Sequence, residues 1–223
     1  MGIQDNIRQF IEGLDSNVKL VAVSKTKSVG EILEAYHSGH KIFGENRIQE
    51  LVYKAGELPK DIQWHMVGHL QTNKVKYIAP FIHLIHSIDS VKLLNVINKE
   101  AHKNDRIIDG LLQIHIAREE TKFGLSEEEA IGILESTEYQ QMRNIRLTGL
   151  MGMATFTDDM DGIRKEFRFL AGVFHRIKKR FFSEKPWFCE LSMGMSGDYQ
   201  IAIEEGSTLI RVGTLIFGER NKH

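Results

Sequence analysis

Cysteine, proline and long apolar runs are scarce in this chain of 223 residues. The one cysteine, Cys189, excludes an internal disulfide and is typical of proteins that work in a reducing cytoplasm. No apolar run reaches the roughly 18 residues that a membrane-spanning helix requires. The segment 1–14 is amphipathic and contains acids, which excludes a secretory signal and a transit peptide. We therefore expect a cytoplasmic protein without membrane contact, in which Cys189 lies buried in an apolar strand.

An excess of charge of one sign is also lacking, and so are linker-like segments. Lys and Arg total 29 while Asp and Glu total 30, which gives a formal net charge of −1. Such a balance carries no global signal for nucleic acid or for an anionic membrane. The basic run at 176–180 is typical of the solvated end of a helix. With three prolines and no Gly/Ser-rich tract, the sequence predicts a single domain over residues 1–223.

Apolar, strand-like runs alternate with segments whose apolar residues recur with a helical period. Ser126 and Glu129 have the spacing of a capping box at a helix start, and 157–181 is the longest predicted helix. Eight nearly continuous apolar runs with helices between them predict an α/β fold, a (β/α)8 TIM-type barrel. A doubly wound open sheet is the competing architecture. The predicted strands cover residues 18–25, 41–46, 62–70, 82–88, 110–117, 146–155, 187–195 and 208–214.

Polar residues and glycines collect where the predicted strands end, which is where a barrel holds its binding site. Lys25 ends the first strand, after four apolar residues, 20–23, and Ser24. Its amine would point into a partly desolvated mouth, where burial disfavours the ammonium form and leaves a nucleophile. Such a lysine can form a Schiff base with an aldehyde. The alternative is a lysine whose stem lies on the rim and whose charge stays in water.

Two glycine-containing turns follow the last two predicted strands. Ser196 and Gly197 precede a short helical stretch at 198–206, whose N-terminus would attract an anion. Gly213 and Thr214 lie at the next turn and can add further donors. TIM barrels often hold phosphate after these two strands. We therefore predict a phosphate group between the two turns.

Arg211 comes directly before the second of these turns. A guanidinium group keeps its proton in proteins, so it can only donate hydrogen bonds. Facing a pyridine nitrogen, Arg211 would leave that nitrogen unprotonated and would make the ring a poor electron sink. The alternative for Arg211 is an ion pair with Glu190, Glu204 or Glu205.

Seven ordered blocks of this sequence resemble those of the pyridoxal phosphate homeostasis proteins, a family of barrels that bind pyridoxal 5'-phosphate (PLP). The blocks extend from about Val18 to Arg220 and are AVSKTKS, FGENRIQE, WHMVGHLQTNK, REETKFG, GLMGMAT, LSMGMSGDYQIAIEEGSTLIRVGT and IFGER. This family is related to the N-terminal domain of alanine racemase. The resemblance implies a (β/α)8 barrel with PLP at the carboxyl ends of the strands.

The resemblance also implies roles for single residues. Lys25 matches the lysine that forms the Schiff base, and Arg211 matches the arginine that faces the pyridine nitrogen. Lys27 and Lys122 are the candidates for lysines that take part in PLP exchange. Gly197 departs from the family pattern, in which we expect a polar residue. The other implied cofactor-binding residues are Asn46 beside the ring, Met151 and Thr155 in the pocket wall, and Ser192, Ser196, Gly213 and Thr214 for the phosphate.

The function implied by the resemblance is PLP binding in vitamin B6 and amino-acid homeostasis, as a carrier without catalytic turnover. PLP-requiring apoenzymes are the implied partners, and we expect a monomer because no dimerisation domain is appended. A PLP-dependent racemase is the alternative. Alanine racemase takes a second base, a tyrosine, from an added domain, and this sequence ends at His223, so a barrel residue such as His69 or Tyr199 would have to substitute. A barrel that binds a phosphate ligand without covalent chemistry is the third hypothesis.

Ten histidines raise the question of a metal site. His65 and His69 are four residues apart, and His83 and His86 are three apart. The segment HMVGH lacks the glutamate of HExxH and lies in a predicted strand rather than in a helix. We therefore expect no metal.

Overall fold

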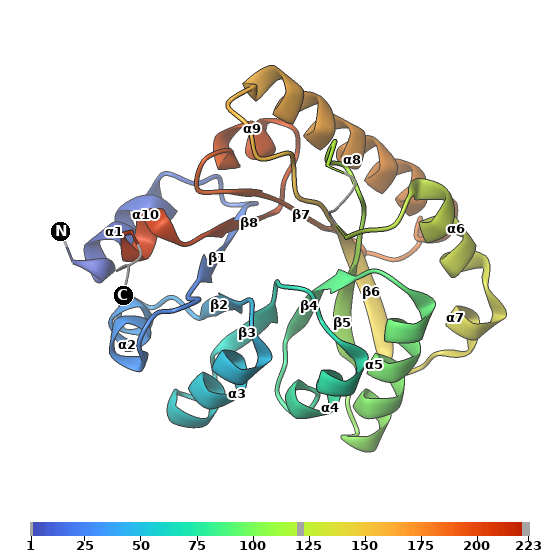
Figure 1. Ribbon diagram of the computed structural model, residues 1–223, viewed down its shortest axis with the longest axis horizontal. Helices are drawn as coiled ribbons and strands as arrows, with labels where there is room; N and C mark the ends of the chain where they lie inside the picture. Colours follow the sequence, from blue (N-terminus) through green and yellow to red (C-terminus); the bar gives the residue numbers. More distant parts are fainter. Residues whose placement is uncertain (1, 120–122, 220–223) are drawn as a thin grey trace.

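The protein folds into a closed barrel of eight parallel strands with helices around its outside (Figure 1). The computed structural model describes residues 2–119 and 123–219. The strands follow one another around the barrel in sequence order, and the eighth pairs with the first. The predicted (β/α)8 TIM-type barrel is therefore confirmed, and the closed sheet excludes the doubly wound alternative.

Helices connect the strands throughout, as the alternation of apolar runs and helical periods predicted. The strands are β1 (Lys19–Val23), β2 (Ile42–Glu45), β3 (Gln63–Met66), β4 (Leu84–Ile88), β5 (Ile108–Gln113), β6 (Ile145–Met151), β7 (Glu190–Met195) and β8 (Leu209–Val212). The helices are α1 (Ile3–Glu12), α2 (Val29–His37), α3 (Ile48–Glu57), η1 (Thr72–Lys74, a 3-10 helix), α4 (Val75–Ile78), α5 (Val91–Lys103), α6 (Glu127–Glu135), α7 (Thr137–Gln141), α8 (Met160–Phe181), α9 (Tyr199–Glu204) and α10 (Thr214–Phe217).

Several strands end earlier than the sequence pattern predicted. β1 ends at Val23, so Lys25 lies in the turn after the strand instead of within it. β3 ends at Met66 although the apolar run continues to residue 70. The residues that follow these strand ends lie at the rim of the barrel.

The predicted capping box at the start of α6 and the predicted long helix with a basic end, α8, are both confirmed. The Ser126 side chain accepts a hydrogen bond from the Glu129 N–H, and the reciprocal contact completes the predicted capping box of α6. α8 is the longest helix described, with 22 residues. Its last turn carries Lys178, Lys179 and Arg180, where the negative end of the helix dipole stabilises positive charge.

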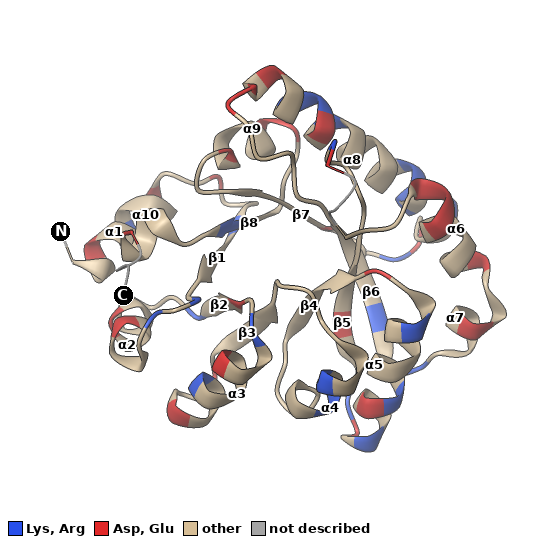
Figure 2. Cartoon of the chain, viewed as in Figure 1, with Lys and Arg blue, Asp and Glu red and all other residues tan. Residues whose placement is uncertain are grey.

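Apolar side chains fill two separate regions. The larger one lies between the strands and the surrounding helices and includes the fully buried Phe43, Phe167 and Phe188. The smaller one consists of strand residues that point into the barrel, such as Val21 and Met151. Charged residues lie mostly on the helices and loops, while the strands carry few (Figure 2). The fold thus separates a solvated outer surface from an apolar wall around the barrel.

Cys189 is exposed, which corrects the prediction that it is buried in a strand. The seventh strand begins at Glu190, so Cys189 lies just before it, at the end of the barrel where the strands begin. Its sulfur lies 3.6 Å from the carbonyl oxygen of Trp187. Among the described helices, none is both long enough and apolar enough to cross a membrane.

The barrel wall leaves no room for a side chain at Gly149. A Cβ built there would lie 1.7 Å from the backbone oxygen of Glu190, with which Gly149 is paired across β6 and β7. We expect Gly149→Ala to lower the free energy of unfolding by at least about 3 kcal/mol, because the backbone must shift. The matched control is Gly132→Ala in α6, where a Cβ meets open space. It should raise stability by about 0.5–1 kcal/mol. Urea unfolding measures both, and equal stabilities would contradict the close approach of these strands.

Candidate functional site

A cavity of about 540 Å³ opens at the carboxyl ends of the strands, and we call it the upper cavity. Its lining comes from the ends of β1, β7 and β8, from residues that follow these strands and β2, β3 and β6, and from the first turn of α8. These strands bring together residues that lie far apart in the sequence. The predicted site residues that line it are Lys25, Asn46, Thr155, Ser196, Arg211, Gly213 and Thr214.

Lys25 is half-buried and lies in a tight turn after β1. The next residue, Thr26, has a φ of 65°, a left-handed backbone conformation that β-branched residues rarely adopt. The Thr26 N–H donates to the Glu50 carboxylate at 2.8 Å, which offsets part of that strain. Lys25 itself lines the cavity.

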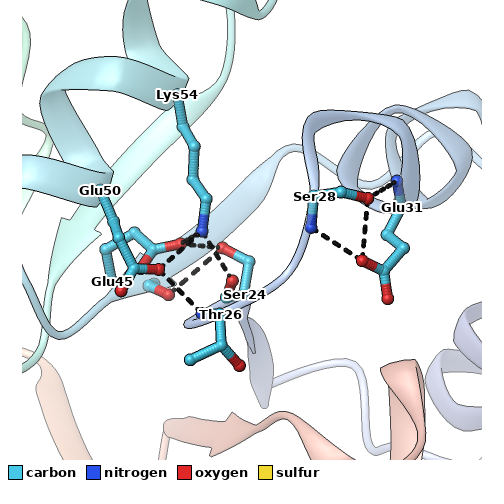
Figure 3. A network of polar contacts seen from close by, with 8 residues as sticks. Ser24, Thr26, Ser28, Glu31, Glu45, Glu50 and Lys54 are labelled. Atoms are coloured by element: carbon cyan, nitrogen blue, oxygen red, sulfur yellow. Dashed lines mark hydrogen bonds and ion pairs between the residues drawn. The ribbon is translucent and has the colours of Figure 1, made fainter. Parts of the chain in front are cut away.

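A buried lysine on α3 holds the same turn from outside the barrel (Figure 3). Lys54 Nζ donates to the Ser24 carbonyl oxygen at 2.9 Å, to Glu45 at 2.7 Å and to Glu50 at 3.1 Å. The Ser24 hydroxyl adds a 2.6 Å hydrogen bond to Glu45. Burial raises the pKa of Glu45, and the contacts of Lys54 and Ser24 oppose that rise. We call Ser24, Glu45, Glu50 and Lys54 the turn anchor.

Lys27 also lines the upper cavity, but its amine is engaged elsewhere. Nζ donates to the Phe217 carbonyl oxygen at 2.9 Å and lies 3.4 Å from Glu31. These contacts join the turn after β1 to the last helix, α10. Lys122, the other lysine predicted to take part in exchange, lies outside the described residues.

The turns after β7 and β8 meet beside Lys25. Ser196 Oγ accepts a hydrogen bond from the Gly213 N–H at 3.4 Å, which joins the two turns predicted to hold an anion. A Cβ at Gly213 would lie 2.9 Å from the Val23 carbonyl oxygen, so this close approach to β1 requires glycine. Gly197 needs no such freedom, because a Cβ there meets open space. α10 begins at Thr214, so its first N–H groups lie at the cavity.

Arg211 projects from β8 and is buried below the cavity opening. It donates to Ser192 Oγ at 2.6 Å and to the Gly152 carbonyl oxygen at 3.0 Å. Burial lowers the pKa of Arg211 to about 10, and the nearby Asp198 opposes this, so the side chain stays charged at neutral pH. The alternative ion pairs are not formed: the expected acids are bound instead by Lys19, Arg164 and Arg168.

Below Arg211, a chain of hydrogen bonds crosses the barrel interior. Ser192 Oγ contacts His86 Nδ1 at 2.9 Å, and His86 Nε2 contacts His65 Nδ1 at 3.0 Å. Arg211 can only donate, and His86 Nδ1 is the one acceptor in contact with Ser192 Oγ among the described residues, so the buried hydroxyl satisfies its hydrogen by donating it to His86 Nδ1. His86 then carries its hydrogen on Nε2 and donates to His65 Nδ1, which leaves the His65 hydrogen on Nε2. Burial holds the pKa of both histidines well below the ordinary value, so both are neutral.

Met151 and Ser192 are placed differently from the other predicted site residues. Both are fully buried inside the barrel, and neither is part of the cavity lining. Met153 lines the cavity instead. Ser192 is connected to the upper cavity only through Arg211, whose guanidinium donates a hydrogen bond to Ser192 Oγ. Thr155 does line the cavity, and its hydroxyl donates to Glu166 on α8 at 2.7 Å.

The two side chains considered as substitutes for a second base do not line the upper cavity. His69 lies 3.5 Å from Asp89 and stacks on Phe123 with ring centres 4.3 Å apart. Tyr199 packs on Phe10 with ring centres 5.1 Å apart. Sequence position alone placed both near the rim, but packing directs them into other contacts.

Comparison with known proteins identifies the family of this barrel. The chain matches the family described as "Alanine racemase, N-terminal domain" over residues 2–221. It is 40% identical over 203 residues to a pyridoxal phosphate homeostasis protein of Aquifex aeolicus, covering 91% of this chain and 87% of that protein. The chain belongs to the pyridoxal phosphate homeostasis protein family. The human member of this family is 37% identical over 213 residues, covering 91% and 77% of the two chains.

Two solved structures are similar to this barrel. PipY of Synechococcus elongatus, with PLP bound, is 32% identical, with a TM-score of 0.87 and coverage of 97% of this chain and 100% of that one. An alanine racemase of Bartonella henselae is 15% identical, with a TM-score of 0.70. The match covers 99% of this chain but 60% of the racemase. The second likeness shows a shared barrel fold.

Loss of the cation in the turn anchor should destabilise the protein. Lys54→Met leaves the Glu45 carboxylate buried without its partner, which costs about 3–5 kcal/mol at neutral pH. The substitution removes contacts that oppose the rise in the Glu45 pKa, so this pKa should rise further. When the pKa of a carboxyl is higher in the folded state than in the unfolded state, the free energy of unfolding falls as the pH rises through the folded-state pKa. The loss caused by Lys54→Met should therefore be smaller at pH 5 than at pH 8.

Urea unfolding at both pH values measures this difference. Lys92→Met, an exposed lysine on α5, is the matched control and should change stability by less than about 0.5 kcal/mol. A Lys54→Met loss that stays the same from pH 5 to pH 8 would show that Glu45 is not the group left unpaired.

Proposed function

We propose that this protein binds PLP in the upper cavity through a Schiff base with Lys25 and acts in intracellular vitamin B6 homeostasis as a carrier. The observation that carries the proposal is that Lys25, Arg211 and the joined Ser196–Gly213 turns line one cavity. These are partners for three polar parts of PLP. The amine suits the aldehyde, the guanidinium suits the ring nitrogen, and the backbone donors suit the phosphate.

The residues present fit this group by their own chemistry. Gly213 has no side chain, and its place against Val23 leaves backbone groups facing the cavity. Arg211 is held by Ser192 and Gly152, so it presents a fixed charged donor to a ring acceptor. A cavity of about 540 Å³ has ample room for one PLP molecule. The family supports the same conclusion, because PipY is a relative with PLP bound.

A carrier role is favoured over amino-acid racemisation by the lining of the upper cavity. Among the described residues that line it there is no tyrosine or histidine that could act as a second base opposite Lys25. Arg211 would donate a hydrogen bond to the ring nitrogen and keep its own proton. The ring nitrogen would then stay unprotonated, and the ring would be a weak electron sink. Relatives named pyridoxal phosphate homeostasis proteins match most of the chain, whereas racemases share only the fold.

PLP-requiring apoenzymes are the acceptors that this role implies. The upper cavity opens to solvent beside the exposed Phe156 and Met160, so a recipient could approach it directly. We further propose that the protein works as a monomer in the cytoplasm, where its one exposed cysteine would stay reduced.

Borohydride reduction after incubation with PLP tests the linkage, because only an imine is trapped. We expect peptide mass spectrometry to find the reduced adduct on Lys25, and we expect Lys25→Ala to stay colourless. Lys27→Ala is the matched control in the same turn and should still become yellow, because the Lys27 amine is bound to Phe217 and Glu31. An adduct on Lys27, or equal loading of Lys25→Ala, would refute the assignment. A wild-type protein that never binds PLP would refute the function.

Exchange of the Cα hydrogen separates a carrier from an enzyme. PLP-loaded protein is incubated in D2O with a panel of amino acids, and incorporation of deuterium is followed by mass spectrometry. We expect no more exchange than with the same concentration of free PLP, because no tyrosine or histidine is among the described residues that line the cavity. Rapid exchange that depends on the protein would establish turnover and overturn the carrier proposal.

A further inference from the structure

A second cavity, of about 370 Å³, opens at the opposite end of the barrel, and we call it the lower cavity. Each of the eight strands contributes its first or second residue to the lining. Apolar Leu84 and Leu209 form part of its buried floor, and the exposed His83 lies near its edge. This cavity is separate from the upper one, because the barrel interior lies between them.

The charged residues of the lower cavity occur as two neutral pairs. Lys19 on β1 pairs with Glu190 on β7. Arg146 on β6 binds Asp109 on β5 through two hydrogen bonds of 2.7 Å. Two cations and two carboxylates therefore surround the opening, and their formal charges cancel. A ligand with both signs of charge would find a partner for each.

Two buried polar atoms of the lower cavity have no hydrogen-bond partner among the described residues. They are His65 Nε2 and Thr148 Oγ1, and both side chains line the cavity. His65 is 3% exposed and Thr148 is 4% exposed. A buried polar group without a partner is costly, and most native proteins satisfy such groups. Two of them in one cavity indicate a ligand that supplies the missing partners.

The hydrogen-bond chain inside the barrel decides what kind of partner is missing. Starting from Arg211, the donor directions through Ser192 and His86 leave the His65 hydrogen on Nε2. His65 therefore offers a donor to the lower cavity. The Thr148 hydroxyl can donate as well. A carboxylate, with two acceptor oxygens, matches two donors in one cavity better than an ammonium or an apolar group does.

We propose that the lower cavity binds a small zwitterion of the α-amino-acid type. Its carboxylate would accept hydrogen bonds from His65 Nε2 and Thr148 Oγ1 at the floor. Its ammonium group would face Asp109 and Glu190 near the opening. A simple anion would add a net negative charge to an opening whose formal charges already cancel, which is why a ligand without net charge is favoured. This proposal rests on the lower cavity alone and does not depend on PLP binding.

NMR of PLP-free protein labelled with 15N at histidine tests the proposal. The reporter is the His65 Nε2–H signal, and the titrants are glycine, acetate and methylamine. We expect a saturable shift with glycine, weaker binding of acetate, which lacks the ammonium, and no shift with methylamine, which lacks the carboxylate. A His65 signal that shows no saturable change with glycine up to about 100 mM, roughly a hundredfold above a millimolar Kd, would overturn the proposal.

A matched pair of substitutions distinguishes the two cavities. Thr148→Val keeps the shape of the side chain but removes the hydroxyl, and it should weaken glycine binding about tenfold. Thr214→Val makes the same change in the upper cavity and should leave the glycine titration unchanged. If Thr214→Val weakens the binding and Thr148→Val does not, glycine binds in the upper cavity and the proposal is wrong. The wild-type titration decides the question even if one variant folds poorly.

Discussion

The pairing of β8 with β1 is the constraint on which both ends of the barrel depend. It aligns Val21 with Arg211, and the chain beyond each of these residues then reaches the same rim. Lys25 and Gly213 thereby line one cavity although they come from opposite ends of the sequence. In an open sheet with the same strand order, β1 and β8 would lie at opposite edges. Because all strands are parallel, the same closure collects the strand starts at the other rim and forms the lower cavity.

The interior of this barrel also contains a chain of polar side chains, in which each hydrogen bond has a defined donor and acceptor. His65, His86, Ser192 and Arg211 come from β3, β4, β7 and β8, and they contact one another across the interior. Burial makes an unpaired polar group costly, so a chain in which each member satisfies the next is stable only as a whole. The permanent donor at Arg211 sets the hydrogen positions of the others. As a result, one end of the chain offers a charged donor to the upper cavity and the other end offers a neutral donor to the lower cavity.

The turn that bears Lys25 is organised by groups outside the barrel. Glu45 and Lys54 lie between the strands and α3, with side chains that are 0% and 4% exposed. Removing both charges from water is unfavourable, and burial outweighs the contacts of Glu45 enough to raise its pKa. Their contacts fix Ser24 and, through Glu50, Thr26. A turn that is already ordered loses less entropy when the neighbouring Lys25 binds a ligand.

The periodicity of the sequence was sufficient for the fold, because apolar runs and helical segments that alternate eight times have few compact arrangements. It was also sufficient to place Lys25 and the glycine-containing turns at strand ends, since composition changes abruptly there. The blocks that resemble the pyridoxal phosphate homeostasis proteins then named the family. The predicted strand ends were less accurate, and Cys189 was wrongly assigned to a buried strand, because an apolar run can extend beyond the paired residues at either end of a strand.

What the sequence by itself determined, then, is the order and kind of the elements and the residue types at their ends. Only the tertiary structure decided which of those residues meet. The contacts of Lys54 with Ser24 and of His86 with His65 depend on strand register and on which face each side chain occupies. The same applies to Met151, which faces the closed interior, while Met153 reaches the upper cavity. Local pattern cannot specify these contacts, because side chains on adjacent positions of a strand point to opposite faces and their partners come from distant parts of the chain.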